Sequence, residues 1–331
     1  MDFKEFIGID VSKLTIDACI HSSQDVNVFE NNSKGYKKLI KWIEKNSSFN
    51  LKNTIVVFEH TGLYSYNLSV FCEDNKLSFV ALPGLEIKQS MGMVRGKTDE
   101  VDARRIALYG YRRRDELTPS KLQCKQLTKI KRLLTLREQL VKQRAALKTS
   151  LKETSSVFKV KTNQLLFQIQ KRVINTLSKE INKIEVELKT IIEGNEELNH
   201  QYKLLVSVKG IGDQMAYNLI VYTDGFNKFN NARKFAAYCG IAPFPHSSGT
   251  SINKKNRVSH LANKKLKSLL NMCAVSAIQH SPEMKLYFQK RINEGKNKMC
   301  VINIIRNKLV HRAFAVIKRG TPYVEVNNFL T

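Results

Sequence analysis

The stretch Phe3–Lys13 reads FKEFIGIDVSK, and its apolar centre ends on a carboxylate, Asp10. A short apolar run of this kind predicts a buried β-strand. A buried strand with an acid at its end is a common start for a phosphate or metal site. Two more apolar segments, Leu14–Ile20 and Val26–Phe29, follow after short polar joints. The three segments together predict an antiparallel meander.

Helical and strand patterns alternate after the meander. Strands are expected at Thr54–Phe58, which runs into Glu59, and at Leu77–Leu82. Helices are expected at Tyr36–Lys45, Tyr64–Asp74, Leu85–Val94 and, after a capping Thr98, Asp99–Arg114. This order fits an α/β layer fold of the RNase H type, in which the first and fourth strands lie side by side.

Four carboxylates are expected to meet in such a fold. Asp10 and Glu59 end neighbouring strands, which lie about 4.8 Å apart, so both can share one ion. Asp99 and Asp102 are three residues apart at a helix start and therefore lie on one face. A lone first-turn acid has a simpler interpretation, because it complements the helix dipole. Four acids together repel one another without cations, so the pattern predicts a site for Mg²⁺, which prefers hard oxygen ligands.

The formal net charge of +26 is the strongest feature of the composition of this 331-residue chain. Lys121–Val160 holds 11 Lys and Arg against 2 Glu, and Ser251–Gly320 holds 16 against 2. Concentrated positive charge predicts a polyanionic partner. Nucleic acid is favoured over a membrane surface because no basic amphipathic anchor is visible.

Neither a membrane span nor a secretory leader is expected. No apolar run reaches the about 18 residues that a span requires, and the start MDFKEFIG lacks a basic segment followed by an apolar one. The six cysteines are far apart and form no zinc-type spacing, which predicts reduced packing residues. A cytoplasmic location is expected.

The middle of the chain carries two long helical patterns, Lys121–Ser150 and Leu165–Ile191, with a bend expected at Thr154–Val160. They predict an antiparallel hairpin of coiled-coil type or a pairing surface for another subunit. The expected domains are an α/β domain at 1–118, a helical linker at 119–200 and a mainly helical domain at 201–331.

The last third of the chain is expected to contact nucleic acid. The turn Lys209-Gly210-Ile211-Gly212 separates two helical patterns within Leu204–Tyr222. Backbone N–H groups at the start of the second helix suit a phosphate, which predicts a helix-hairpin-helix contact; an ordinary tight turn is the alternative. Further candidate phosphate contacts are Lys254, Lys255, Arg257, Lys264 and Lys265. Helices are also expected at Leu266–Ile278 and Met299–Val316.

Several motifs resemble one known family. Phe6–Asp10 (FIGID), Phe58–Gly62 (FEHTG) and Lys97–Arg104 (KTDEVDAR) resemble the RuvC-like domain of the DEDD transposases of the insertion sequence one-ten family. Gly240–Pro243 (GIAP), followed by Ser247-Ser248-Gly249, resembles its C-terminal transposase domain. Tyr287–Gly295 and Gly320–Tyr323 resemble its closing stretch. The resemblance covers nearly the whole chain, with a departure at Ala262, where the family usually has glycine.

The resemblance implies a site-specific DNA recombinase that moves its own element, guided by a structured bridge RNA. The four acids would hold Mg²⁺. Ser248 would attack a DNA phosphate and form a covalent phosphoserine link, with the adjacent Ser247 as the other candidate. The family works as an oligomer in which a serine of one subunit completes the acid site of another, so a homo-oligomer is implied.

Three other functions are compatible with parts of the pattern. A junction-resolving nuclease would use the same acids with water as the nucleophile, and Ser248→Ala separates it from the transposase. Ile7–Asp10 also resembles the first phosphate loop of sugar kinases and actin-like ATPases, but no second glycine-rich loop is visible. A non-enzymatic nucleic-acid-binding protein would not require the four acids and the Ser-Gly motif.

Overall fold

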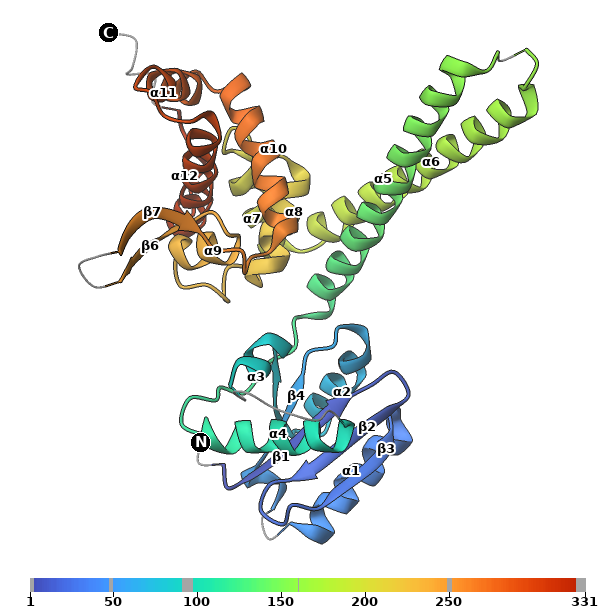
Figure 1. Cartoon of the computed structure of the whole chain (residues 1–331), viewed down its shortest axis with the longest axis vertical. Coiled ribbons are helices and arrows are strands. Elements are labelled where there is room, and N and C mark those ends of the chain that lie inside the picture. Colours follow the sequence, from blue (N-terminus) through green and yellow to red (C-terminus); the bar gives the residue numbers. More distant parts are fainter. Residues whose placement is uncertain (1–2, 48–49, 91–97, 160, 249–251, 326–331) are drawn as a thin grey trace. The chain divides into compact units, whose positions relative to one another are not determined.

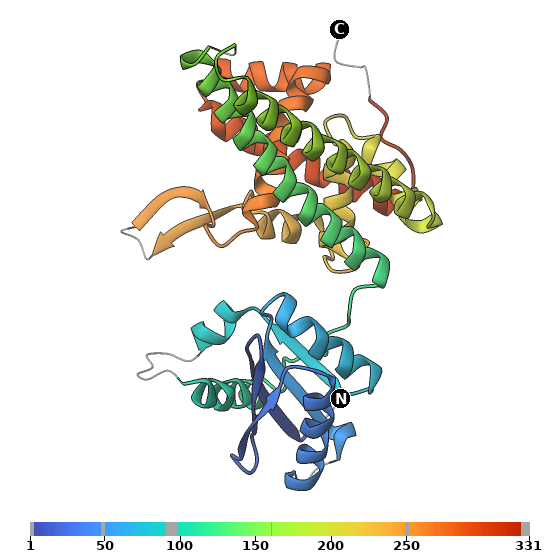
Figure 2. The same cartoon turned by 90° about the vertical axis from the view of Figure 1, so that its right-hand side faces the viewer.

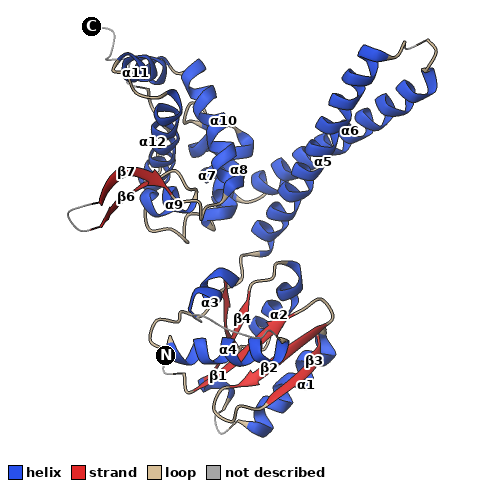
Figure 3. Cartoon of the chain, viewed as in Figure 1, coloured by secondary structure: helices blue, strands red, loops and turns tan. Residues whose placement is uncertain are grey.

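The computed structural model describes residues 3–47, 50–90, 98–159, 161–248 and 252–325. Contacts divide the chain into two compact units, Met1–Leu122 and Gln123–Thr331. Figure 3 shows a β-sheet with helices packed around it in the first unit and mostly helices in the second. The expected fold class is confirmed at this level. The finer division into three domains stays a prediction.

The sheet of the first unit has the strand order β3-β2-β1-β4-β5. Its strands are β1 (Glu5–Val11), β2 (Thr15–Ile20), β3 (Val26–Glu30), β4 (Thr54–Glu59) and β5 (Ser78–Leu82). The first three pair antiparallel, while β1 pairs parallel with β4 and β4 with β5. The predicted meander and the predicted pairing of the first and fourth strands are confirmed (Figure 1).

Helices cover both faces of this sheet. They are α1 (Ser33–Asn46) and α2 (Leu63–Asp74) on one face, and α3 (Gly84–Ser90) and α4 (Asp99–Arg112) on the other (Figures 1 and 2). Side chains alternate along β1, so Ile7 and Ile9 pack with α1 and α2, while Phe6 packs with α3 and α4. Asp10 follows the spacing of Phe6 and therefore belongs to the α4 face.

Gly8 explains how α4 lies so close to β1. A Cβ atom on Gly8 would come within 2.1 Å of the backbone nitrogen of Ala107 and 2.3 Å of the carbonyl oxygen of Ala103. Only a residue without a side chain permits this approach. The glycine of the FIGID motif therefore fixes the helix that carries two of the four acids.

The second unit begins with a helical hairpin of α5 (Lys125–Val157) and α6 (Gln164–Glu193). Ion pairs between Lys129 and Glu187 and between Arg137 and Glu185 join the two helices, with N–O distances of 2.5 and 2.6 Å. The expected bend is wrong in its first half, because α5 continues to Val157. Ser155 and Ser156 lie inside this helix, and their hydroxyls donate to the backbone carbonyls of Lys152 and Glu153.

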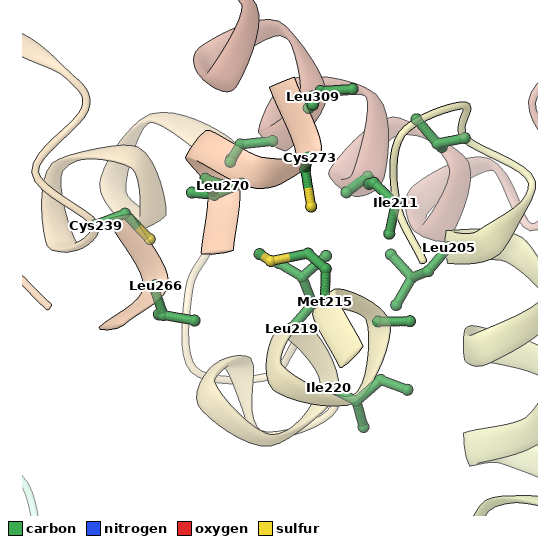
Figure 4. Packing of buried hydrophobic residues seen from close by; sticks show 14 of the residues in the cluster. Leu205, Ile211, Met215, Leu219, Ile220, Cys239, Leu266, Leu270, Cys273 and Leu309 are labelled. Atoms are coloured by element: carbon green, nitrogen blue, oxygen red, sulfur yellow. The ribbon is translucent and has the colours of Figure 1, made fainter. Parts of the chain in front are cut away.

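Six further helices share one hydrophobic core with the base of this hairpin. They are α7 (Glu196–Val206), α8 (Asp213–Thr223), α9 (Ala232–Tyr238), α10 (Lys264–His280), α11 (Pro282–Asn293) and α12 (Lys298–Arg319). Figure 4 shows Ile211, Met215 and Leu219 packed against Leu270 and Cys273 of α10. The expected helices at 266–278 and 299–316 are confirmed, whereas α11 was not expected.

A two-stranded antiparallel sheet departs from the sequence expectation. The strands are β6 (Pro243–Ser248) and β7 (Ile252–Val258), in a region expected to be a turn followed by a basic segment. Two prolines argue against a strand, but both strands here are edge strands, where a missing N–H is tolerated. The ladder is irregular between Phe244 and His246, so Pro245 falls in that irregularity.

Two of the six cysteines contradict the expectation of packing residues. Four are buried, but Cys124 and Cys300 are exposed. Cys124 instead caps α5, with its sulfur accepting from the backbone N–H of Leu127 at 3.5 Å. Across the described ranges, no helix is long and apolar enough to cross a membrane.

Candidate active site and nucleic-acid surface

Asp10 and Glu59 lie at one edge of the sheet of the first unit. Ile9 pairs with Phe58 in the parallel β1–β4 ladder, so the two acids that follow are neighbours. Both side chains belong to the sheet face that α3 and α4 cover, because each follows the alternation of residues packed there. The structure therefore brings together the two strand-end acids that the sequence predicted.

The other two predicted acids come from the first turn of α4. The Thr98 hydroxyl caps this helix by accepting from the backbone N–H of Val101 at 3.3 Å, as expected. Asp99 and Asp102 then lie in the first turn, and α4 packs on β1 through Ala103 and Ala107. The close contact at Gly8 thus brings the first turn of α4 within electrostatic range of Asp10.

The charges of these acids act on one another. The pKa of Asp10 rises from 3.8 to about 6, first because the carboxyl is partly buried and then because of the nearby charges of Asp99, Asp102 and Glu59. Two elements, α4 and β4, therefore place negative charge around Asp10. Such an arrangement favours a bound cation over four free carboxylates.

Asp17 is a fifth acid that the sequence interpretation missed. It lies directly opposite Asp10 in the β1–β2 ladder and is only 9% exposed. Burial raises its pKa, and the charges of Asp99 and Glu100 raise it further. The sequence holds no local signal for this acid, because the pairing of residues 10 and 17 depends on the register of the β1–β2 ladder.

Glu59 and Asp102 each have a close partner within the site. A Cβ atom on Gly84 would come within 2.0 Å of Oε1 of Glu59, so the carboxylate occupies the space that a side chain would fill. The carboxylate of Asp102 accepts from Nη1 of Arg105 at 3.0 Å, in a half-buried ion pair. Gly84 therefore makes room for one acid, while Arg105 neutralises part of the charge of another.

The donor set fits a divalent cation in its chemistry, although the side chains do not form a ready cage. Within the described part of the chain, no group of three or more His, Cys, Asp or Glu side chains is arranged to hold a metal ion. The predicted ligands nevertheless provide hard oxygens and excess negative charge, which are what Mg²⁺ and similar cations require.

The serine candidates end a strand of the second unit. In the β6–β7 ladder, Ser247 pairs with Asn253 and Ser248 pairs with Ile252, so Ser248 is the last residue of β6. Gly249 and the side chains of residues 246–255 lie outside the described part of the chain, and these include Lys254 and Lys255 of β7. The backbone shows the two serines in an extended strand, where a turn was expected.

The glycine turn of residues 209–212 packs on α10. Gly210 has a φ of +94°, and a Cβ atom there would come within 2.8 Å of the carbonyl oxygen of Cys273. Gly212 and Lys209 are exposed, and Gly212 precedes α8 without a side-chain cap. Asp213, in the first turn of α8, accepts from the hydroxyl of Tyr202 at 2.8 Å. A carboxylate thus already complements this helix start.

The same turn borders a groove. Gly210 and Gly212 line an open groove of about 880 Å³, together with Met272 of α10 and Glu185 of α6. The lining combines apolar, acidic and neutral polar side chains and one lysine, Lys189, with the exposed helix start. This mixture gives the helix-hairpin-helix interpretation less support than a uniformly basic lining would.

The basic candidates differ in how free their charges are. Arg257 and Lys264 are exposed. Lys265 is half-buried and forms an ion pair with Glu138 of α5 at 2.9 Å. Across the chain, residues 1–122 hold 18 Lys and Arg against 16 Asp and Glu, while residues 123–331 hold 37 against 13. Nearly all of the excess positive charge therefore lies in the second unit.

Known proteins resemble both units of this chain. The profile of the DEDD-type IS110 transposases matches residues 7–155, and that of the transposase IS116/IS110/IS902 family matches residues 202–289. The pilin gene-inverting protein of Moraxella bovis is 30% identical over 326 residues, which cover 97% of this chain and 98% of that protein. The chain belongs to the IS110 family of transposases.

Other relatives agree with this assignment. The pilin gene-inverting protein of Moraxella lacunata is also 30% identical over 326 residues, again with 98% of that protein covered. The transposase for insertion sequence element IS1111A of Coxiella burnetii is 28% identical over 167 residues, 46% of this chain and 43% of that protein. This IS110-family chain is therefore an enzyme, a DNA recombinase of the transposase class whose substrate is DNA. Its DEDD-type domain implies a divalent metal ion.

Proposed function

We propose that this transposase cuts and rejoins DNA through a covalent phosphoserine intermediate on Ser248, with Mg²⁺ bound in an RNase H-like, RuvC-like first domain. The observation that carries the proposal is the convergence of acids on Asp10. Glu59 comes from the neighbouring strand, while Asp99 and Asp102 come from a helix that Gly8 brings close. Acids from separate elements around one point are typical of sites that hold metal ions for phosphoryl transfer.

The four acids have the role of metal ligands in this proposal. When bound there, Mg²⁺ supplies positive charge that stabilises the attacked phosphate and the departing oxygen. Asp10 is central because the other three acids all raise its pKa. Asp17, which pairs with Asp10 on the neighbouring strand β2, adds further negative charge beside it.

Ser248 has the role of nucleophile. Its Oγ loses a proton and forms a bond to phosphorus, while the bond between phosphorus and one DNA oxygen breaks and that oxygen takes up a proton. The number of phosphate ester bonds is unchanged, so rejoining needs no ATP. Ser247 is the alternative nucleophile, and the neighbouring His246 is a candidate base.

The basic second unit has the role of holding nucleic acid. Its 37 Lys and Arg against 13 acids support contacts with DNA and with a structured bridge RNA that pairs with donor and target. Contacts to phosphates position a nucleic acid without recognising its sequence. In this proposal the DNA sequence is recognised by base pairing with the guide RNA. The proposed contacts are Lys209, Gly210, Gly212, Lys254, Lys255, Arg257, Lys264 and Lys265.

The assembly belongs to the proposal as well. The α5–α6 hairpin has the role of a coiled coil, and the protein acts as a homo-oligomer in which the serine of one subunit serves the acid site of another. Ion pairs between α5 and α6 show that the hairpin is paired within the chain, so a partner subunit would contact its outer faces.

The test is a denaturing gel of the full-length protein with Mg²⁺, candidate guide RNA and labelled DNA that carries its element junction. We expect label to remain on the wild-type protein and on Ser247→Ala, and to be lost in Ser248→Ala. Loss in Ser247→Ala alone would move the nucleophile by one residue. Asp10→Ala should form no adduct, and an adduct that survives this change would contradict the role of the acids.

A junction nuclease that uses water is the second candidate. It is favoured by the fact that all four acids come from the first unit, so cleavage by water needs no serine from the second unit. The same gel separates the two functions. Cleaved DNA without an adduct in any lane would support the nuclease.

A further inference from the structure

A buried arginine of the second unit has amides, not acids, around its charge. Arg306 of α12 is only 6% exposed. Its guanidinium donates to Oδ1 of Asn271 on α10 and, at 3.5 Å, to Oδ1 of Asn303 one turn earlier on α12. Burial lowers the pKa of Arg306, and within the described part of the chain its Nε has no hydrogen-bond partner. A buried charge without a counter-charge is costly, so the choice of asparagines requires a reason.

Asn303 contacts two groups that make opposite demands. Its Oδ1 accepts from Arg306, while its Nδ2 donates to the backbone carbonyl of Ile241 at 2.8 Å. A carboxylate at position 303 would neutralise the guanidinium, but it has no N–H to donate to that carbonyl. An amide of the same size serves both groups. The guanidinium can approach only the oxygen of this amide, so it also fixes which end of Asn303 faces Ile241.

Ile241 lies at the root of the strand that ends with the proposed nucleophile. Ile241 and Ala242 directly precede β6, and their backbone N–H groups both donate to the carbonyl of Ala236 in α9, at 3.0 and 3.3 Å. Gly240 has a φ of +67°, and a Cβ atom there would come within 2.3 Å of the Cβ atom of Ala262, which follows β7. The two ends of the β6–β7 hairpin therefore meet beside α9 (Figure 1), where α12 donates its hydrogen bond.

We propose that Arg306 and Asn303 are positioning residues, which hold the root of β6 and thereby set the place of Ser248. Asn303 contacts the root directly, and Arg306 acts through Asn303. The sheet has only two strands, and such a sheet is marginally stable by itself, so its position depends on the anchoring of its root. The role of Ser248 rests on the proposed function, whereas the anchoring of the strand does not.

A simpler role for Arg306 would be to tie α12 to α10 through Asn271. Such a tie does not need an amide at position 303, and apolar side chains join two buried helices at lower cost than an uncompensated charge. The contact with Asn271 also supplies a matched control. Asn271→Ala removes one acceptor of the same guanidinium without touching Ile241.

The first measurement is hydrogen exchange of the full-length protein at pH 8 without DNA, read by mass spectrometry in β6 and β7. We expect exchange in β6 of Asn303→Asp to be about 5- to 100-fold faster than in wild type, because a buried carbonyl loses its donor. Arg306→Met should give a smaller increase, since the donor remains but its orientation is no longer fixed. Asn271→Ala should exchange like wild type in β6.

Thermal melts separate anchoring from overall stability. Asn303→Asp supplies a counter-charge to the guanidinium and Arg306→Met removes the buried charge, so both should melt at or above the wild-type temperature. Faster exchange in β6 of a protein that melts no lower than wild type is a local effect on the hairpin.

The second measurement is the single-turnover rate of adduct formation on labelled element-junction DNA with Mg²⁺ and guide RNA, beside the affinity for the same DNA. We expect Asn303→Asp to form the adduct about 10- to 100-fold more slowly with unchanged affinity, since a misplacement of about 1 Å costs up to about 100-fold. A tie between two helices predicts no such difference between rate and binding.

Three outcomes would overturn the proposal. Wild-type exchange in β6 of Asn303→Asp would mean that the contact with Ile241 does not hold the strand. Equal effects of Asn271→Ala and Asn303→Asp on exchange and rate would leave only the tie between helices. A loss of affinity as large as the loss of rate would assign these residues to DNA binding. Absence of an adduct in wild type would instead contradict Ser248 as the nucleophile, and the exchange in β6 would still decide whether Asn303 anchors the strand.

Discussion

Gly8 and Ala107 touch backbone to backbone, with the amide nitrogen of Ala107 only 2.1 Å from where a Cβ on Gly8 would lie. The atoms in the way belong to the backbone of α4, which cannot turn aside as a side chain can. The position of α4, and with it that of Asp99 and Asp102, therefore depends on a missing side chain in β1.

Gly8→Ala should destabilise the first unit. The methyl group would force α4 away from β1, and overpacking of this kind costs about 1–3 kcal/mol. Thermal melts followed by circular dichroism should show a lower Tm, and the protein should also lose strand cleavage. A Tm equal to that of the wild type would show that α4 is not seated on Gly8.

Gly84→Ala should reduce strand cleavage with little effect on the stability of the fold. The atom it would meet is Oε1 of Glu59, at the far end of a side chain that can rotate. We expect a Tm within about 1 °C of wild type, because a rotated side chain relieves the clash at little cost, together with cleavage reduced by an order of magnitude or more as Glu59 turns away. Measured side by side, the two glycine variants distinguish a scaffold position from a site position. Full activity in Gly84→Ala would remove Glu59 from the proposed ligands.

Asp10→Asn should stabilise the protein when no divalent cation is present. The pKa of Asp10 is about 6 in the folded protein and 3.8 in the reference state, so the folded state binds more protons between these values. Stability from this group is therefore full below about pH 4 and falls as the pH rises through 6. The neutral variant escapes that loss.

The gain should develop between about pH 4 and pH 6 and be complete above pH 6. At pH 8 we expect Asp10→Asn to melt about 3 °C or more above wild type, the shift that about 1 kcal/mol gives in a domain of this size after screening is allowed for. At pH 4 the two should melt together. Added Mg²⁺ should raise the Tm of wild type and close the gap. The exposed Asp25→Asn serves as control, and an equal gain there would point to overall charge as the cause.

Lys264 and Lys265 should contribute differently to nucleic-acid binding. Lys264 is exposed, whereas Lys265 is already paired with Glu138. A lysine that contacts one phosphate changes the slope of log K against log salt by about 1. Lys264→Ala should therefore lower the slope by about 1 and Lys265→Ala by less. Lys41→Ala, exposed on α1, is the control, and identical slopes for Lys264→Ala and this control would exclude Lys264 from the contact.

Strand-end acids and helix starts were predictable from the sequence because they depend on local order. A β-branched run that ends on Glu59 and a threonine that caps a helix at Asp99 are visible in a few consecutive residues. The resemblance to the family then predicted one common role, metal binding, for these acids. The comparisons bear out the family, while the roles of the individual residues stay predictions.

Features that depend on register or on tertiary contact were not predictable in the same way. Asp17 joins the acids only because it pairs across the ladder with Asp10. Strands β6 and β7 were missed because Pro243 and Pro245 are unfavourable in a central strand, and nothing in the sequence shows that these two strands lack outer neighbours. The contact between Gly84 and Glu59 joins residues 25 positions apart and leaves no local signal.

The uneven division of charge between the two units bears on how such an enzyme is altered over time. Carboxylates that attract a cation also repel the phosphates on which they act. In this chain nearly all of the excess positive charge belongs to residues 123–331, and the acids belong to a unit with almost balanced charge. The excess positive charge and the proposed metal ligands are therefore encoded in different stretches, so a lineage can change the basic surface without rebuilding the acid cluster.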